Sequence, residues 1–147
     1  MTKHRFTACV ALACFAFASA GAFAQDHAYS EGAVQVVTKI RTLDGHFDDY
    51  MKYLDTTYKK EQEAAKKLGY IVTYEVVQLN PAGPNDPDLL LITTLKNFAG
   101  LDGALAKGDA ISKQFEGSVA NANKATGERN QIRRILGTEV GQVLELK

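Results

Sequence analysis

Four segments of the chain have the short, β-branched and partly alternating pattern of strands. In the first, Val36, Thr38 and Ile40 share one face while mostly polar residues fill the other, which indicates a strand with one face in the core. The third segment is apolar on both faces, which favours a central place in a sheet. The predicted strands are residues 33–43, 70–79, 89–96 and 138–147.

Between these strands the apolar spacing changes to the period of helices. Asp44 is suited to cap the first helix, which is expected to reach Leu68, since Gly69 can take the left-handed conformation that ends many helices. Asn97 is placed to cap a short helix. A longer helical pattern covers residues 109–136, and because glycines interrupt it, the sequence leaves open whether it forms one helix or two.

The order strand, helix, strand, strand, helix, strand predicts an α+β fold of the ferredoxin-like type, βαββαβ. Its four-stranded antiparallel sheet would carry the helices on one face. The first helix supplies an apolar arc toward that face, so its aromatic side chains are expected to be mostly core. The arc contains Phe47, Tyr50, Met51, Leu54, Tyr58, Ala65 and Leu68, with His46 and Tyr53 at its border.

Glu61 interrupts this apolar arc, and a buried carboxylate needs a partner, a proton or a cavity. The later helical pattern has a matching irregularity, because Arg129 and Arg133 lie in its apolar stripe. Two interpretations stay open: a structural ion pair between Glu61 and one arginine, or a pocket that these groups line together with nearby tyrosines. The candidate ligand-binding residues are Tyr53, Tyr58, Glu61, Tyr74, Arg129 and Arg133.

Residues 1–24 have the pattern of a secretory signal peptide, with a basic start, an apolar run and small residues before the cleavage point. Residues 25–32 would form a flexible polar lead-in to a domain over residues 33–147. Cleavage would remove Cys9 and Cys14, so the mature chain would have neither thiols nor disulfides. We therefore expect a periplasmic or secreted protein with no membrane span after cleavage.

The chemistry left to the mature chain is narrow. Its formal net charge would be −2, since two of the seventeen basic residues and none of the seventeen acidic ones precede the cleavage point. This balance gives no basic surface for nucleic acid. The remaining histidines, His27 and His46, are too few for a metal site without cysteines. There is no glycine-rich phosphate loop, and no cofactor is expected.

Three stretches together resemble the dimeric α/β-barrel superfamily: HFDDYMKYLDTTYK, DPDLLLITTLKNFAGLDG and RRILGTEVGQVLEL. The resemblance covers residues 33–146 and is nearest to uncharacterised exported members, and more distantly to NIPSNAP-like and EthD-like domains. It implies a homodimer whose two sheets form a barrel, with a cavity between the sheet and the helices of each protomer. The chain departs from haem-degrading members because it has no tryptophan, and His46 has no partner.

We therefore expect a homodimer, joined through apolar sheet faces, that binds a small apolar or aromatic molecule between sheet and helices. One alternative is a cofactor-independent oxygenase or isomerase acting on a small aromatic substrate. In that case His46 or Glu61 would remove a proton and Arg133 would steady the resulting anion. Another alternative is a purely structural or assembly role.

Overall fold

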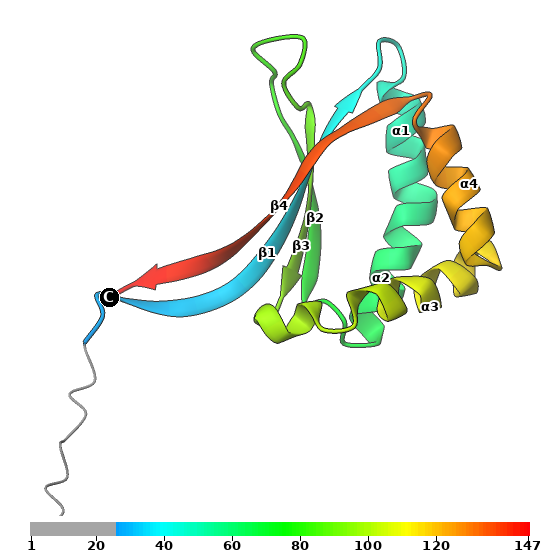
Figure 1. Cartoon of the computed structure of the whole chain (residues 1–147). Helices are drawn as coiled ribbons and strands as arrows, with labels where there is room; N and C mark the ends of the chain where they lie inside the picture. The colour runs from blue at the N-terminus through cyan, green and yellow to red at the C-terminus, as the bar shows by residue number, and fades with distance from the viewer. Residues whose placement is uncertain (1–25) are drawn as a thin grey trace, which may run out of the picture.

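The computed structural model describes residues 26–147, which form one antiparallel sheet with all helices on one side (Figure 1). The strand order is β2-β3-β1-β4, which is the ferredoxin-like βαββαβ arrangement that the sequence predicted. The strands are β1 (Tyr29–Thr42), β2 (Thr73–Gln78), β3 (Leu89–Leu95) and β4 (Arg133–Leu146). The central position of the third strand is confirmed.

The core lies between the sheet and the first long helix. Val34, Ile40 and Leu89 are at most 1% exposed and belong to the strand face that turns toward the helices. Tyr50 and Leu54 close the core from the helix side. Residues directly opposite on paired strands share a face, so Ile40 and its partner Leu89 lie on the same side of the sheet. Since both are buried, the predicted division of β1 into a core face and a more polar face is confirmed.

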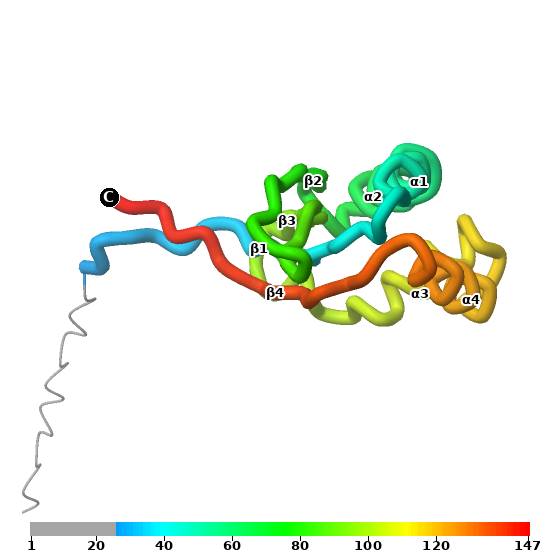
Figure 2. The backbone as a smooth tube through the Cα atoms, turned by 90° about the horizontal axis from the view of Figure 1, so that it is seen from above, coloured from blue at the N-terminus to red at the C-terminus, as the bar shows by residue number. Residues whose placement is uncertain are grey.

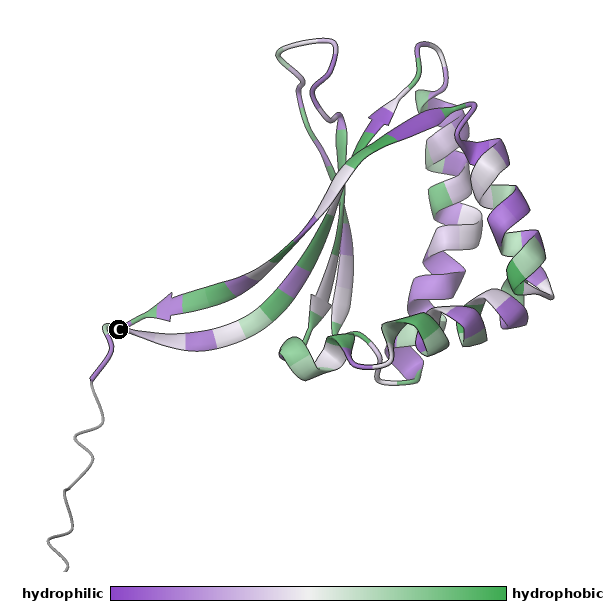
Figure 3. Ribbon diagram, viewed as in Figure 1, coloured by the Kyte–Doolittle hydropathy of each residue, from purple (hydrophilic) through white to green (hydrophobic). Residues whose placement is uncertain are grey.

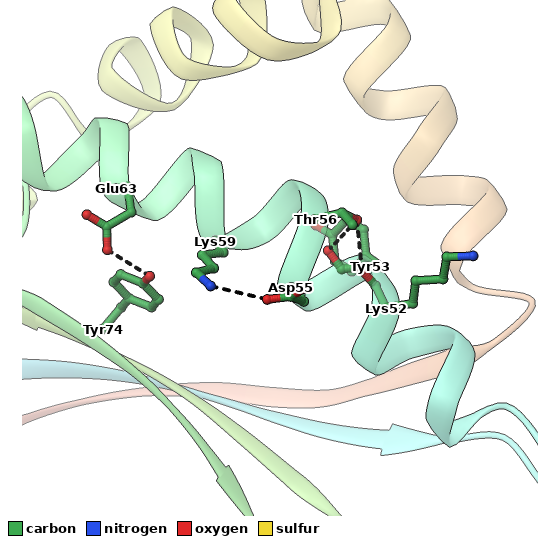
Figure 4. A network of polar contacts seen from close by, with 7 residues as sticks. All are labelled: Lys52, Tyr53, Asp55, Thr56, Lys59, Glu63 and Tyr74. Carbon is green, nitrogen blue, oxygen red and sulfur yellow. Dashed lines mark hydrogen bonds and ion pairs between the residues drawn. The ribbon is translucent and has the colours of Figure 1, made fainter.

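The first helix is continuous but contains one wide turn. It consists of α1 (Phe47–Tyr53), a π-helical turn η1 (Leu54–Tyr58) and α2 (Lys59–Lys67). The Thr56 hydroxyl donates to the Lys52 carbonyl oxygen at 2.7 Å (Figure 4), which gives that carbonyl a partner where the regular ladder widens. The predicted cap was wrong, since Asp44 lies in a turn and the helix begins after His46. Gly69 has φ +72° and ends the helix as predicted.

The second helical region consists of separate pieces: η2 (Phe98–Leu101), α3 (Ala104–Glu116) and α4 (Val119–Arg129). Gly117 breaks the longer pattern with φ +76°, and the Ser118 side chain accepts from the Asn121 amide to start α4. The sequence left one helix or two open, and the structure has two. Figure 2 shows α1 with α2 as one group of helices and α3 with α4 as a second group beside it.

The second region ends earlier than predicted, and β4 begins at Arg133 instead of residue 138. The predicted helical stripe that joined Arg129 to Arg133 is therefore wrong, because only Arg129 is on the helix. The segment from Arg133 onward is rich in β-branched and aliphatic residues and pairs with the end of β1. Sheet pairing overrides the helical spacing of the same residues.

β1 and β4 extend past the other strands as a two-stranded ribbon that curves away from the helices and carries the C-terminus (Figure 1). β1 begins at Tyr29, so four residues of the predicted flexible lead-in belong to the sheet. Hydrophobic and hydrophilic residues alternate along this ribbon (Figure 3). Exposed apolar side chains on it include Tyr29, Leu144 and Leu146.

The predicted signal peptide, with Cys9 and Cys14, lies outside the described residues. Among residues 26–147, no helix has both the length and the apolar character needed to cross a bilayer.

Candidate functional site

A cavity of about 440 Å³ lies between the sheet and the helices α2 and α3. The sheet contributes Val36 from β1 with Thr93 and Leu95 from β3. The helical side contributes Ala65 from α2 and Ile111 from α3. Because the walls are mainly apolar and a few polar groups interrupt them, the cavity has the composition of a small-molecule site.

Glu61 of α2 is the acidic residue of the cavity wall, and it is half-buried. Burial raises the pKa of its carboxyl group above the ordinary value, while Arg129 lowers it and Glu116 raises it. No lysine or arginine nitrogen of the described residues comes within 4.0 Å of this carboxylate. The predicted ion pair to Arg129 or Arg133 is therefore absent at contact distance, and Glu61 faces the cavity without a direct partner.

The raised pKa of Glu61 gives a prediction about stability. The folded state binds protons more tightly than the unfolded chain between the ordinary pKa of 4.5 and the raised one. Stability therefore rises as pH falls through the raised pKa, and at pH 7 the ionised carboxylate destabilises the fold. Glu61→Gln should raise the free energy of unfolding at pH 7, by less than about 1 kcal/mol because the group is half exposed.

Urea denaturation of Glu61→Gln at pH 7 and below about pH 4 measures this effect, since the difference from the wild type should vanish once both states are protonated. Glu63→Gln is the matched control on the same helix. The Glu63 carboxylate accepts a hydrogen bond from the Tyr74 hydroxyl at 2.9 Å. The glutamine amide oxygen can accept only a weaker, uncharged hydrogen bond, so this variant should gain no stability. A loss of stability in Glu61→Gln would mean that an ion pair holds this carboxylate.

Lys107 is the cationic residue of the cavity wall, and its ammonium group is already engaged. Nζ donates to the Gly100 carbonyl oxygen at 2.9 Å and lies 5.7 Å from the centre of the Tyr70 ring. These contacts tie α3 to the turn before it and to the segment before β2. Lys107 therefore supports the wall, and Glu61 is the charged group that remains without such contacts.

Tyr58 and Tyr74 lie behind the cavity wall rather than in it. Their rings meet edge to face at 6.1 Å, and the Tyr74 hydroxyl points to Glu63 (Figure 4). Tyr58 is buried, and this burial raises its pKa to about 12. Tyr58 and Tyr74, two of the three tyrosines predicted to bind a ligand, are therefore placed as packing residues that connect the helix to the sheet.

Arg129, Arg133, Tyr50 and Tyr53 form a second group, which we name the arginine cluster. The guanidinium carbon of Arg129 lies 4.4 Å from the centre of the Tyr53 ring, and that of Arg133 lies 5.9 Å from the centre of the Tyr50 ring. Burial raises the pKa of Tyr53 to about 12, against the opposing effect of Arg129. None of the four residues lines the cavity.

His46 lies apart from both groups. Its Nδ1 is 2.8 Å from a carboxylate oxygen of Asp49, one turn along α1, and both side chains are exposed. The proposed catalytic set of His46, Glu61 and Arg133 is therefore not gathered in the cavity, since only Glu61 lines it. Within residues 26–147 no cluster of three or more histidine, cysteine or acidic side chains could hold a metal ion.

Sequence reasoning missed the wall that η2 and α3 supply. Ala104 and Gly108 of α3 line the cavity with small side chains, and Ile111 follows one turn further. Gly100 of η2 allows close packing instead, since a Cβ on it would lie 3.0 Å from the Cβ of Leu95. The spacing of Ala104 and Gly108, one helical turn apart, is the signal for this wall that the sequence carries.

Comparison with known proteins gives one solved structure of similar shape. HapK from Hahella chejuensis aligns over 74% of this chain and 90% of its own length, with a TM-score of 0.48 and 12% identical residues. No family model matches the chain. No curated protein matches it either.

Proposed function

We propose that this protein binds a small apolar or aromatic molecule in the cavity between the sheet and helices α2 and α3. The observation that carries the proposal is an apolar cavity of about 440 Å³ whose wall holds a carboxylate without a direct ion-pair partner, Glu61. Such a cavity buries the body of a ligand, and its few polar groups fix the orientation. From the predicted signal peptide we propose that this binding occurs in the periplasm or outside the cell.

Gly108 offers a direct test, because a Cβ built on it meets no atom within 4 Å and the residue lines the cavity. The side chain of Gly108→Phe would therefore begin in open space at the cavity wall, and we expect its ring to narrow the cavity. We expect at least a tenfold loss in affinity for N-phenyl-1-naphthylamine, a neutral fluorescent aromatic probe, measured by titration at constant protein concentration.

Gly108→Ala is the matched control, since it makes the same backbone change and leaves the cavity open. It should bind the probe as the wild type does and should be more stable by about 0.5–1 kcal/mol, because alanine favours a helix interior over glycine. Equal binding by wild type and Gly108→Phe would contradict the proposal, and so would absence of binding by the wild type.

We further propose that a second copy of the chain covers the sheet face that the helices leave open. The middle of that face is aliphatic, and polar residues such as Gln35 and the ion pair Lys39–Glu139 surround it. When a second copy of the chain packs on such a face, the aliphatic side chains are removed from water, which is favourable. The aliphatic residues are Val37, Val77, Leu90 and Ile92.

Ile92→Glu should abolish this dimer, because two carboxylates would be buried near the symmetry axis. Sedimentation equilibrium should report a dimer for the wild type and a monomer for the variant at micromolar concentration. Gln35→Glu places the same charge nearer the edge of the face and should keep the dimer. A monomeric wild type would contradict the dimer proposal, and it would have no bearing on the cavity proposal.

The catalytic alternative receives less support from the geometry. A proton-transfer reaction in the cavity would have Glu61 as its only predicted participant, because His46 and Arg133 do not line the wall. A purely structural role gives no account of the apolar cavity between the sheet and α3. Non-catalytic binding is therefore the function that the arrangement supports best.

A further inference from the structure

The arginine cluster holds two cations that the fold removes from water. Arg133 is 5% exposed, and Arg129 is partly buried at the end of α4. The Tyr50 and Tyr53 rings against which they pack are themselves stacked, with centres 5.6 Å apart. The cluster therefore joins the end of α4, the start of β4 and the inner side of α1.

The hydrogen bonds of these guanidinium groups leave most of their donors unused. Arg129 Nη2 donates to the Thr126 hydroxyl oxygen at 2.9 Å, and Arg133 Nη1 donates to Asn130 Oδ1 at 2.8 Å. The Nε atoms of both arginines are buried and have no hydrogen-bond partner. Each guanidinium has five N–H donors, so both retain the capacity to bind a further acceptor.

The hydrogen-bond partners of the two arginines, Thr126 and Asn130, are neutral side chains. Within residues 26–147, neither Arg129 nor Arg133 has a carboxylate oxygen within 4.0 Å. Glu61 is near enough for Arg129 to affect its pKa, but it forms no ion pair with it. Buried cations in folded proteins are normally paired, because an isolated one loses its hydration without compensation. Both cations of the cluster therefore lack a carboxylate at contact distance, and Asp88 and Glu61 act on its tyrosines only from further away.

We infer that the arginine cluster binds a carboxylate, with a small organic acid as the ligand. A guanidinium is planar and directs two parallel N–H donors at one acceptor group, and a carboxylate matches this geometry with two oxygens in one plane. The anion would take N–H donors of the two guanidinium groups that Thr126 and Asn130 leave unused, with the buried Nε atoms among them. Arg129 gives access, because it is partly exposed and lies on α4, none of whose residues is buried.

This site is separate from the cavity, since none of its residues lines the cavity wall. The inference therefore goes beyond the proposed binding of an apolar molecule and does not depend on it. A probe for the cavity should be neutral, and a probe for the arginine cluster should be acidic, so that each proposal can fail alone.

The test titrates sodium benzoate into the wild-type protein and follows the arginine Nε–H signals by ¹H–¹⁵N NMR spectroscopy. We expect a saturable shift of the signals of Arg129 and Arg133. Benzamide has the same ring and shape without the charge, and at equal ionic strength it should leave these signals in place. Absence of a saturable shift, or an equal response to benzamide, would overturn the inference and mean that water satisfies these donors.

Variants then locate the binding. Arg129→Gln should weaken benzoate binding at least tenfold, and Arg129→Lys should weaken it less, because the charge remains while the planar fork is lost. Arg134→Gln is the matched control, since Arg134 is exposed on the next strand position and should not affect the titration. If Arg134→Gln weakens binding as much as Arg129→Gln, the response is general attraction to surface charge and the inference is wrong.

Discussion

Replacing Tyr50 by alanine is expected to lower the free energy of unfolding by about 3–5 kcal/mol, the range for a large aromatic residue truncated in a core. Tyr50 is 2% exposed and belongs to the cluster that joins Ile40 and Leu89 of the sheet to Leu54 of the helix. Since a domain of this size is stabilised by only about 5–15 kcal/mol, the loss is a large share of the total. Chemical denaturation at pH 7 measures it.

Tyr50→Phe separates packing from the polar part of this effect. The phenylalanine ring fills the same space but loses the hydroxyl that lies beside Arg133, whose charge opposes the rise in the pKa of Tyr50 that burial causes. We expect a cost of about 0.5–1.5 kcal/mol, the net worth of one hydrogen bond. Equal losses in both variants would show that Tyr50 contributes through its hydroxyl and not through its ring.

Replacing Asp88 by alanine is expected to lower the free energy of unfolding by about 1–3 kcal/mol. Its two carboxylate oxygens accept from the Thr42 amide at 3.0 and 3.1 Å, and one also accepts a very short hydrogen bond from the Thr42 hydroxyl. Thr42 is 6% exposed, so the variant would leave its donors buried without partners. The last residue of β1 is thereby anchored to the residue before β3.

Asp88→Asn is the control, because it keeps one acceptor oxygen and removes the charge. It should lose roughly half as much stability as Asp88→Ala, since one donor of Thr42 keeps a partner. Thermal unfolding of the two variants in the same buffer compares them. If Asp88→Asn is as stable as the wild type, the charge of Asp88 adds nothing to the anchoring of Thr42.

Both candidate sites contain charge that the fold itself does not neutralise. Glu61 has a pKa raised by burial and no ion pair, and the arginine cluster has buried donors without partners. Such groups reduce stability, and a protein retains them where they serve binding. The two sites differ in sign, so the cavity favours a neutral or donor-bearing ligand and the cluster favours an acid.

The outer edge of β4 is open among the described residues. β4 is at the end of the strand order, so along its outer side the backbone donors and acceptors have no neighbouring strand among the described residues. Its exposed apolar residues include Ile135, Val140 and Leu144. Edges of this length are normally covered or protected.

The amino-acid sequence by itself determined the class of fold. The β-branched alternation in the first segment fixes which of its residues face the core, because side-chain direction in a strand has a period of two. The uniformly apolar third segment indicates a central strand. The aromatic arc of the first helix and the end of this helix at Gly69 follow from equally local rules. These features depend on neighbours in the chain, so they can be read from it.

The tertiary structure alone decided where the sites lie. The sequence placed Arg133 on a helix beside Arg129, but pairing with Thr42 of β1 draws Arg133 into β4 and buries it. It left an ion pair or a pocket open for Glu61, and only the placement of α3 decided that a cavity lies at that residue. Contacts between distant segments determine burial and charge pairing, and no local period records them.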